Sequence, residues 1–255
     1  MVSILILLYL VAAIAHLYNL YSKRDALLYV GIGTLIAGFV FHSFLLGFYY
    51  LSTDEHDWGT WLNSLAWAIV LLYLIVFLRY REMALGGFAV PAAFVLAGYA
   101  TASPGIWGKG SQTVEGFLLG SHAVLAILSA STFFLLFAVA LMFVVQSREL
   151  KSKRPGAWLR RLPPLDVLDD LSHKALYFGF TFLTASLFFG SMWAWSKYGI
   201  IWASKPLKIW PMLGIWLAYG VLLSCRLTRS WKGMRSAVFS MATFLAVLVA
   251  LLVHI

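Results

Sequence analysis

The chain has 255 residues, of which 62% are hydrophobic and 11% are charged, and its formal net charge is +9. Soluble domains carry roughly a quarter charged residues, so this composition leaves too few charges to cover a water-exposed surface and excludes soluble enzyme folds. The apolar runs are long and do not alternate with polar residues, which is typical of membrane-spanning helices and not of barrel strands.

Polar and charged clusters divide the chain into eight apolar segments, and each is predicted to be a membrane-spanning helix. No basic residue precedes the first segment, whereas Lys23 and Arg24 follow it, so we expect a retained span and not a cleaved signal peptide. The prediction is an all-α, polytopic helical bundle that forms a single transmembrane domain over residues 1–255. The eight segments are centred near Ala12, Ala37, Leu71, Phe94, Phe134, Ala185, Gly214 and Ala246.

The basic residues divide unevenly between the two sides of the membrane, which predicts the orientation of the chain. The outer side keeps only Lys109, Lys197, Lys205 and Lys208. Both termini are therefore expected outside a bacterial cytoplasmic membrane. The charges flank spans and form no continuous face, so the lipid bilayer, and not nucleic acid, is the expected partner. The inner side holds fifteen of the 19 basic residues, namely Lys23, Arg24, Arg79, Arg81, Arg148, Lys151, Lys153, Arg154, Arg160, Arg161, Lys174, Arg226, Arg229, Lys232 and Arg235.

The longest predicted loop runs from about residue 147 to residue 172 on the inner side. It is basic first and then acidic, and Pro163 and Pro164 are expected to end one segment within it. The stretch from there to His173 is interpreted as a short amphipathic entry into the sixth span. A loop of this kind supports one functional hypothesis, a cofactor-free interaction protein that acts on a cytoplasmic partner.

Two of the six histidines are predicted to lie inside the membrane at similar depth. His42 and His122 are each expected on the order of 12 Å below the outer boundary, on different helices, as a bis-histidine haem site requires. The alternative for each is a core histidine that is hydrogen-bonded to a neighbouring side chain. His56 is expected in a solvated acidic loop, and the remaining histidines are expected to be interface anchors, namely His16, His173 and His254.

Tryptophan is concentrated at the predicted outer face, where an interfacial belt alone would place it at both faces. Indole rings could pack on a flat porphyrin, and the amino groups of Lys197, Lys205 or Lys208 could pair with its propionates. A plain interfacial belt stays open as the alternative. The outer tryptophans are Trp58, Trp61, Trp107, Trp193, Trp195, Trp202 and Trp210, against Trp158 and Trp231 at the inner face.

Several strings, in order along nearly the whole chain, resemble the cytochrome c assembly family of the CcsA/CcmC type, and most of all its HemX/YpjD-like branch. They are residues 85–91 (LGGFAVP), 121–123 (SHA), 162–169 (LPPLDVLD), 216–219 (WLAY) and 230–235 (SWKGMR). The resemblance implies a haem-handling integral membrane protein. By this resemblance, His122 matches an outer haem-ligating histidine of the family, and His42 and His173 match histidines of the HemX/YpjD-like branch.

The chain departs from the haem-delivering members of the family in three places. The Trp-rich segment at residues 193–210 lacks their acidic residue, Ser224 and Cys225 stand where they carry a transmembrane histidine, and the sequence given ends before their outer extension. The resemblance therefore implies an accessory or regulatory protein, at most a component of a haem lyase system. Cys225 is the single cysteine, which excludes covalent c-type haem attachment to this chain.

Three functions follow as hypotheses. The first is non-covalent binding of b-type haem near the outer face by His122 and His42, with Trp193, Trp195, Trp202, Trp210 and Lys205 around it. Its partners would be cytochrome c maturation proteins or a cytoplasmic haem-biosynthesis enzyme. The second is the cofactor-free interaction protein, and the third is a single-haem b-type electron-transfer subunit. A transporter is not favoured, because no Asp or Glu lies within a predicted span.

Overall fold

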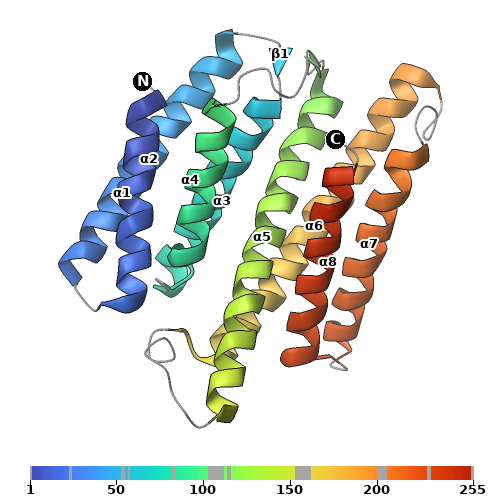
Figure 1. Ribbon diagram of the computed structural model, residues 1–255. Coiled ribbons are helices and arrows are strands. Elements are labelled where there is room, and N and C mark those ends of the chain that lie inside the picture. The colour runs from blue at the N-terminus through green and yellow to red at the C-terminus, as the bar shows by residue number, and fades with distance from the viewer. Residues whose placement is uncertain are drawn as a thin grey trace. The chain divides into compact units, whose positions relative to one another are not determined.

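The computed structural model describes residues 2–22, 25–52, 55–56, 58–81, 84–102, 112–113, 116–152, 162–199, 206–228 and 231–253. These residues form eight α-helices and two very short strands (Figure 1). Each predicted apolar segment centre falls within one helix, which confirms the all-helical prediction. The elements are α1 (Val2–Tyr21), α2 (Asp25–Ser52), β1 (Glu55–His56), α3 (Trp58–Tyr80), α4 (Gly86–Ala102), β2 (Gln112–Thr113), α5 (Gly116–Ser152), α6 (Leu165–Tyr198), α7 (Pro206–Leu227) and α8 (Met234–Val253).

Six of the helices in the described part of the chain, α1, α2, α3, α5, α6 and α7, are long and apolar enough to cross a membrane. The other two, α4 and α8, contain shorter apolar stretches over Gly86–Ala102 and Met234–Val249. The protein is therefore a multi-pass helical membrane protein. The orientation of its termini across the membrane stays a prediction.

The chain divides into two compact units. The N-terminal unit comprises Met1–Val114 and Pro155–Pro163, and the C-terminal unit comprises Glu115–Arg154 and Pro164–Ile255. In the N-terminal unit, α1 packs against α2 and α4, and α3 packs against α4 and α2, so the four helices close a ring. The strands β1 and β2 pair antiparallel, with Glu55 opposite Thr113 and His56 opposite Gln112.

Glycines let the helices of the N-terminal unit approach closely. A methyl group at Gly86 on α4 would overlap the His16 ring and the Tyr73 hydroxyl, both of which are buried. Elsewhere on the same helix, a methyl group at Gly98 would meet nothing within 4 Å. Small residues at such crossings allow the backbones of membrane helices to pack against each other.

Gly86→Ala is therefore expected to destabilise the protein by about 1–3 kcal/mol, because overpacking forces buried rings out of their places. Gly98→Ala is the matched control on the same helix and should change the stability by no more than about 0.5 kcal/mol. Unfolding of both variants in detergent by SDS titration measures the difference. Equal stabilities would show that α4 does not approach α1 and α3 in this way.

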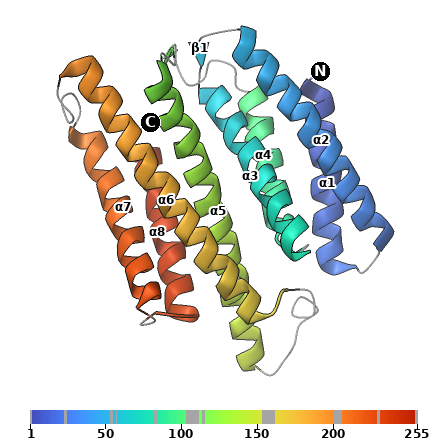
Figure 2. The ribbon, with the colours of Figure 1, turned by 180° about the vertical axis from the view of Figure 1, so that it is seen from behind.

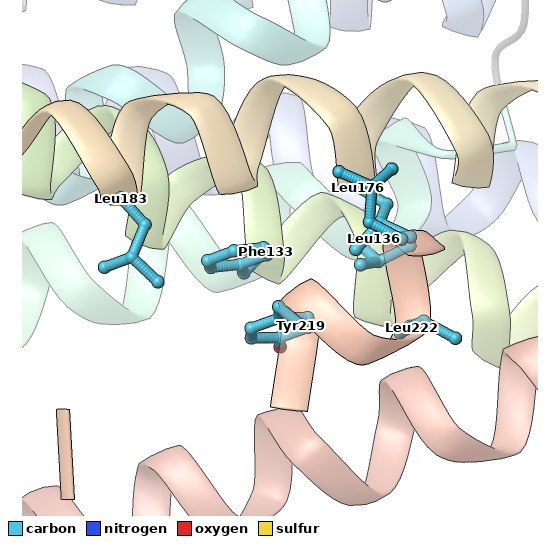
Figure 3. Packing of buried hydrophobic residues seen from close by; sticks show 7 residues of the cluster. Phe133, Leu136, Leu176, Leu183, Tyr219 and Leu222 are labelled. Atoms are coloured by element: carbon cyan, nitrogen blue, oxygen red, sulfur yellow. The ribbon is translucent and has the colours of Figure 1, made fainter. Parts of the chain in front are cut away.

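In the C-terminal unit, α5 packs against α6 and α8, and α7 packs against α6 and α8, so these four helices also close a ring (Figure 2). Its core is apolar, with Leu136, Leu176 and Leu222 fully buried around the Phe133 and Tyr219 rings (Figure 3). Those two rings are stacked with centroids 3.8 Å apart and planes at 4°. This core holds α7 against α5 and α6.

The loop between α5 and α6 is shorter than the sequence suggested. Helix α5 continues to Ser152 and α6 begins at Leu165, directly after the extended Pro164 (φ −51°, ψ 147°). Pro163 and Pro164 directly precede α6, and that they end a preceding segment stays a prediction, because residues 153–161 lie outside the described residues. The stretch from Leu165 to His173, expected to be the entry into the sixth span, forms the first turns of α6 itself. At its other end, α6 stops at Gly199, whose φ of 69° lies in the left-handed region and whose N–H bonds to the Trp195 carbonyl.

An ion pair joins three helices at the end of the C-terminal unit where α6 begins. The guanidinium of Arg226, near the end of α7, donates to the carboxylate and to the carbonyl oxygen of Asp169 on α6, both at 2.9 Å. It also donates to the Ser236 hydroxyl on α8 at 2.7 Å. The Gly233 N–H donates to the same Asp169 carboxylate at 3.3 Å. The Arg226 side chain is 4% exposed, so these partners are needed to offset the free-energy cost of burying its charge.

Candidate functional site

His122 lies in the second turn of α5 and faces α6. Its Nδ1 is 2.8 Å from the carbonyl oxygen of Ser186. A carbonyl can only accept, so Nδ1 carries the ring proton, and Nε2 of the neutral ring has a free lone pair. Within the described part of the chain, Nε2 of His122 has no hydrogen-bond partner. This imidazole is thus prepared to bind a metal through Nε2, because metal-bound histidines commonly donate their other N–H to a carbonyl.

Ser186 and Gly190 on α6 form the surface on which the His122 ring lies. The Ser186 hydroxyl, 3.0 Å from Nδ1, donates to the backbone carbonyl of His122 at 3.1 Å. A methyl group at Gly190 would come within 2.7 Å of Nδ1 and 3.0 Å of Cε1. The ring can therefore lie flat against α6 only because residue 190 has no side chain.

A hollow of about 370 Å³ lies one helical turn beyond His122, where α5 begins and α6 ends. It is lined by Gly116, Phe117, Leu118, Trp193, Ser196 and Lys197. Trp193 and Lys197 follow Ser186 and Gly190 at helical spacing, so they lie on the same face of α6. The Lys197 ammonium lies over the Trp193 ring, 5.5 Å from its centroid. The hollow thus combines an indole ring with a positive charge.

The other residues expected around the site are less closely grouped. Trp195 is 59% exposed and Trp210 is 71% exposed, and neither lines the hollow. Trp202 and Lys205 lie outside the described residues, as does the basic part of the α5–α6 loop at residues 153–161. The roles of these residues stay predictions.

His42, on α2, is the second histidine that the sequence singled out. It is 1% exposed, and its Nδ1 is 3.0 Å from the Tyr9 hydroxyl on α1, with the two rings edge to face. Its Nε2 is buried and has no hydrogen-bond partner among the described residues. A buried nitrogen without a partner costs free energy, so Nε2 is suited to an additional ligand.

His16, an expected interface anchor, is a core residue of the N-terminal unit. It is 2% exposed, its Nδ1 donates to the Ala12 carbonyl at 2.8 Å, and its Nε2 accepts from the Tyr73 hydroxyl at 3.1 Å. Both nitrogens are therefore satisfied by the protein, and the interface assignment was wrong. The sequence did not reveal the core position of His16, because its hydrogen-bond partner Tyr73 lies 57 residues away along the chain, on α3.

The two candidate ligands lie at different distances from the ends of their helices, and their equal depth in the membrane stays a prediction. His122 lies about six residues, or ~9 Å, from the start of α5 at Gly116. His42 lies about ten residues, or ~15 Å, before the end of α2 at Ser52. His42 belongs to the N-terminal unit and His122 to the C-terminal unit, so the binding of one haem by both stays a prediction. In the described residues no three His, Cys, Asp or Glu side chains gather into a metal site.

These features define a multi-pass helical membrane protein with single histidines buried along its helices. The sequence model of the cytochrome c assembly protein family matches residues 58–254. The chain belongs to that family, as its residue strings indicated. Its assignment to the HemX/YpjD-like branch stays a prediction.

Known relatives agree with this family. The cytochrome c biogenesis protein CcsA of Chlamydomonas reinhardtii is 28% identical over 193 residues, which cover 73% of this chain and 53% of that protein. CcsA of Guillardia theta is 24% identical over 270 residues, covering 96% and 89% of the two chains. CcsA of Thermosynechococcus vestitus is 34% identical over 86 residues, covering 34% and 27%. The chain thus spans about half of the Chlamydomonas protein. No solved structure matches the chain.

Proposed function

We propose that this protein binds haem non-covalently through His122 and takes part in cytochrome c assembly. One observation carries the proposal. The Nδ1–H of His122 is held by the Ser186 carbonyl, which leaves the Nε2 lone pair free for iron. A histidine with a satisfied Nδ1 and a bare Nε2 is the usual axial donor to haem iron.

The surroundings of His122 suit the rest of a haem molecule. Trp193 offers a flat aromatic face beside the hollow, and Lys197 offers a positive charge for a carboxylate. Haem bound there would supply an iron centre and would be the cargo of assembly. Ser186 would hold the imidazole of His122, Trp193 would provide an apolar surface, and Lys197 would neutralise a haem carboxylate.

His42 is proposed as a second haem ligand. Its unpaired Nε2 fits a metal donor, and the Tyr9 hydroxyl at its Nδ1 can accept the ring N–H and so orient the ring. A core histidine without a ligand would leave this nitrogen unsatisfied. Whether His42 and His122 serve the same haem is answered by titration of each variant.

The proposed setting follows from the family and the charge distribution. The protein would lie in a bacterial cytoplasmic membrane with both termini outside, and it would hold b-type haem near the outer face. Its partners would be cytochrome c maturation proteins, or, for a HemX/YpjD-like regulatory role, a cytoplasmic haem-biosynthesis enzyme. The relatives named CcsA support the assembly role. Any enzymatic activity would be that of one component in a haem lyase system.

The test is a titration of the detergent-purified full chain with hemin, followed at the Soret band, together with a pyridine haemochrome assay of the protein as purified. We expect a non-covalent b-type haemochrome and saturation near one haem or two haems per chain. A colourless protein that also takes up no added hemin would overturn the proposed function. Cofactor-free capture of a cytoplasmic partner by the α5–α6 loop would then be the function to examine.

A further inference from the structure

We infer that Ser186 and Gly190 are positioning residues that fix the tautomer and the ring plane of His122 before any ligand arrives. The inference rests on the proposed function only in that it takes the ligand to be haem. The tautomer and the ring position are properties of the empty protein, so they can be measured without haem.

Two hydrogen bonds cross between the same two residues in opposite directions. The His122 side chain donates to the Ser186 backbone, at 2.8 Å, and the Ser186 side chain donates to the His122 backbone, at 3.1 Å. Ser186 is 1% exposed, so water does not compete well for these bonds. The pair holds α5 and α6 in one register and sets the direction in which the imidazole points.

Gly190 supplies the space that this arrangement needs. An alanine methyl group would stand 2.7 Å from Nδ1 of His122, closer than carbon atoms of side chains approach other atoms in proteins. We expect the ring to turn away from the added methyl group and so lose its bond to the Ser186 carbonyl. Gly190→Ala would therefore break the Nδ1 bond by displacing the His122 ring, and it would remove no proposed haem-contacting side chain.

The chemical consequence concerns the state of Nε2. With Nδ1–H bonded to a carbonyl, the neutral ring keeps its proton on Nδ1 and leaves Nε2 unprotonated. Once the ring turns away, either nitrogen can hold the proton. Part of the population would then present an N–H, and not a lone pair, to the incoming iron.

The first test uses the full chain without haem. Histidine is labelled with ¹⁵N, and the His122 signals are assigned by their loss in His122→Gln. We expect the wild type to show the Nδ1–H tautomer alone, Gly190→Ala to show a mixture of tautomers, and Gly214→Ala to match the wild type. Gly214 is the control because a methyl group there meets nothing within 4 Å. A wild-type His122 protonated on Nε2, or mixed, would overturn the inference.

The second test is hemin binding by the same variants. Gly190→Ala should weaken the binding by about 10- to 100-fold, the usual effect of losing an outer-shell partner, and should shift the midpoint potential of the iron. Gly214→Ala should remain within about twofold of the wild type. In a His122→Ala background, Gly190→Ala should cause no further loss, because it acts through the His122 ring. A further loss of equal size there would overturn the positioning role.

The two tests separate the failure of this inference from that of the proposed function. If the wild type holds the Nδ1–H tautomer but binds no hemin, the positioning role stands and the haem proposal is wrong. If hemin binds through His122 and Gly190→Ala changes neither the tautomer nor the affinity, the haem proposal stands and the positioning role is wrong.

Discussion

Replacing His122 by alanine is expected to lower the affinity for hemin by at least about 100-fold, since it removes an axial ligand and not only an outer-shell partner. Within the described residues the Nε2 atom of His122 has no hydrogen-bond partner, so its lone pair is free to bind iron. The measurement is the Soret titration of the purified variant beside the wild type. Wild-type affinity in His122→Ala would show that the imidazole does not ligate the iron.

Two companion variants make this result specific. Thr181→Ala changes an exposed residue of α6 whose hydroxyl bonds only within its own helix, to the Tyr177 carbonyl, and should leave hemin binding within about twofold of the wild type. His42→Ala tests the other unit of the chain. If His42 and His122 serve one haem, either alanine variant should abolish low-spin bis-histidine spectra. If they serve two, each variant should lose one equivalent.

Asp169→Ala is expected to lower the free energy of unfolding by about 3–5 kcal/mol, because it leaves the buried Arg226 charge without its carboxylate partner. The expected loss is measured by SDS titration in mixed micelles. The neighbouring pair provides the control, since Lys174 and Asp170 form an ion pair at 2.7 Å with side chains 49% and 47% exposed. Asp170→Ala should cost no more than about 0.5 kcal/mol. Equal losses in the two variants would show that the Arg226 charge does not depend on Asp169.

The helices could be predicted from the sequence because each coincides with an apolar run, although in the described part of the chain only six of the eight helices are long and apolar enough to cross a membrane. The residues at which the loops begin and end could not be predicted. Charged residues between 147 and 152 and between 165 and 172 were assigned to a loop, but they belong to α5 and α6. A helix remains favourable beyond the apolar run, because its backbone hydrogen bonds do not depend on side-chain polarity. Hydropathy therefore marks where the hydrocarbon ends and not where the helix ends.

The candidate site, too, could be predicted from the sequence only in part. His42 and His122 could be singled out because an ionisable side chain within a span needs a partner. Their partners could not be found, since Tyr9 and Ser186 lie 33 and 64 residues away along the chain. His16 was misassigned for the same reason. The contact between α6 and α5 could have been inferred from the sequence, because the small residues Gly179, Ser186 and Gly190 recur at helical spacing on one face of α6. Small residues on one face are typical of close contacts between membrane helices.

The length of α6 has a consequence for how the protein sits in its bilayer. An unbroken helix of 34 residues is about 51 Å long, whereas the hydrocarbon core is about 30 Å thick. The surplus of ~20 Å either projects into the headgroups and water or is taken up by tilt. Projection into water is favoured by the exposed charged residues at both ends of α6. These are Asp170 and Lys174 near its start and Lys197 at its end. A thinner or thicker membrane would then change which charged turns are wetted, and would leave the contact of His122 with Ser186 unaltered.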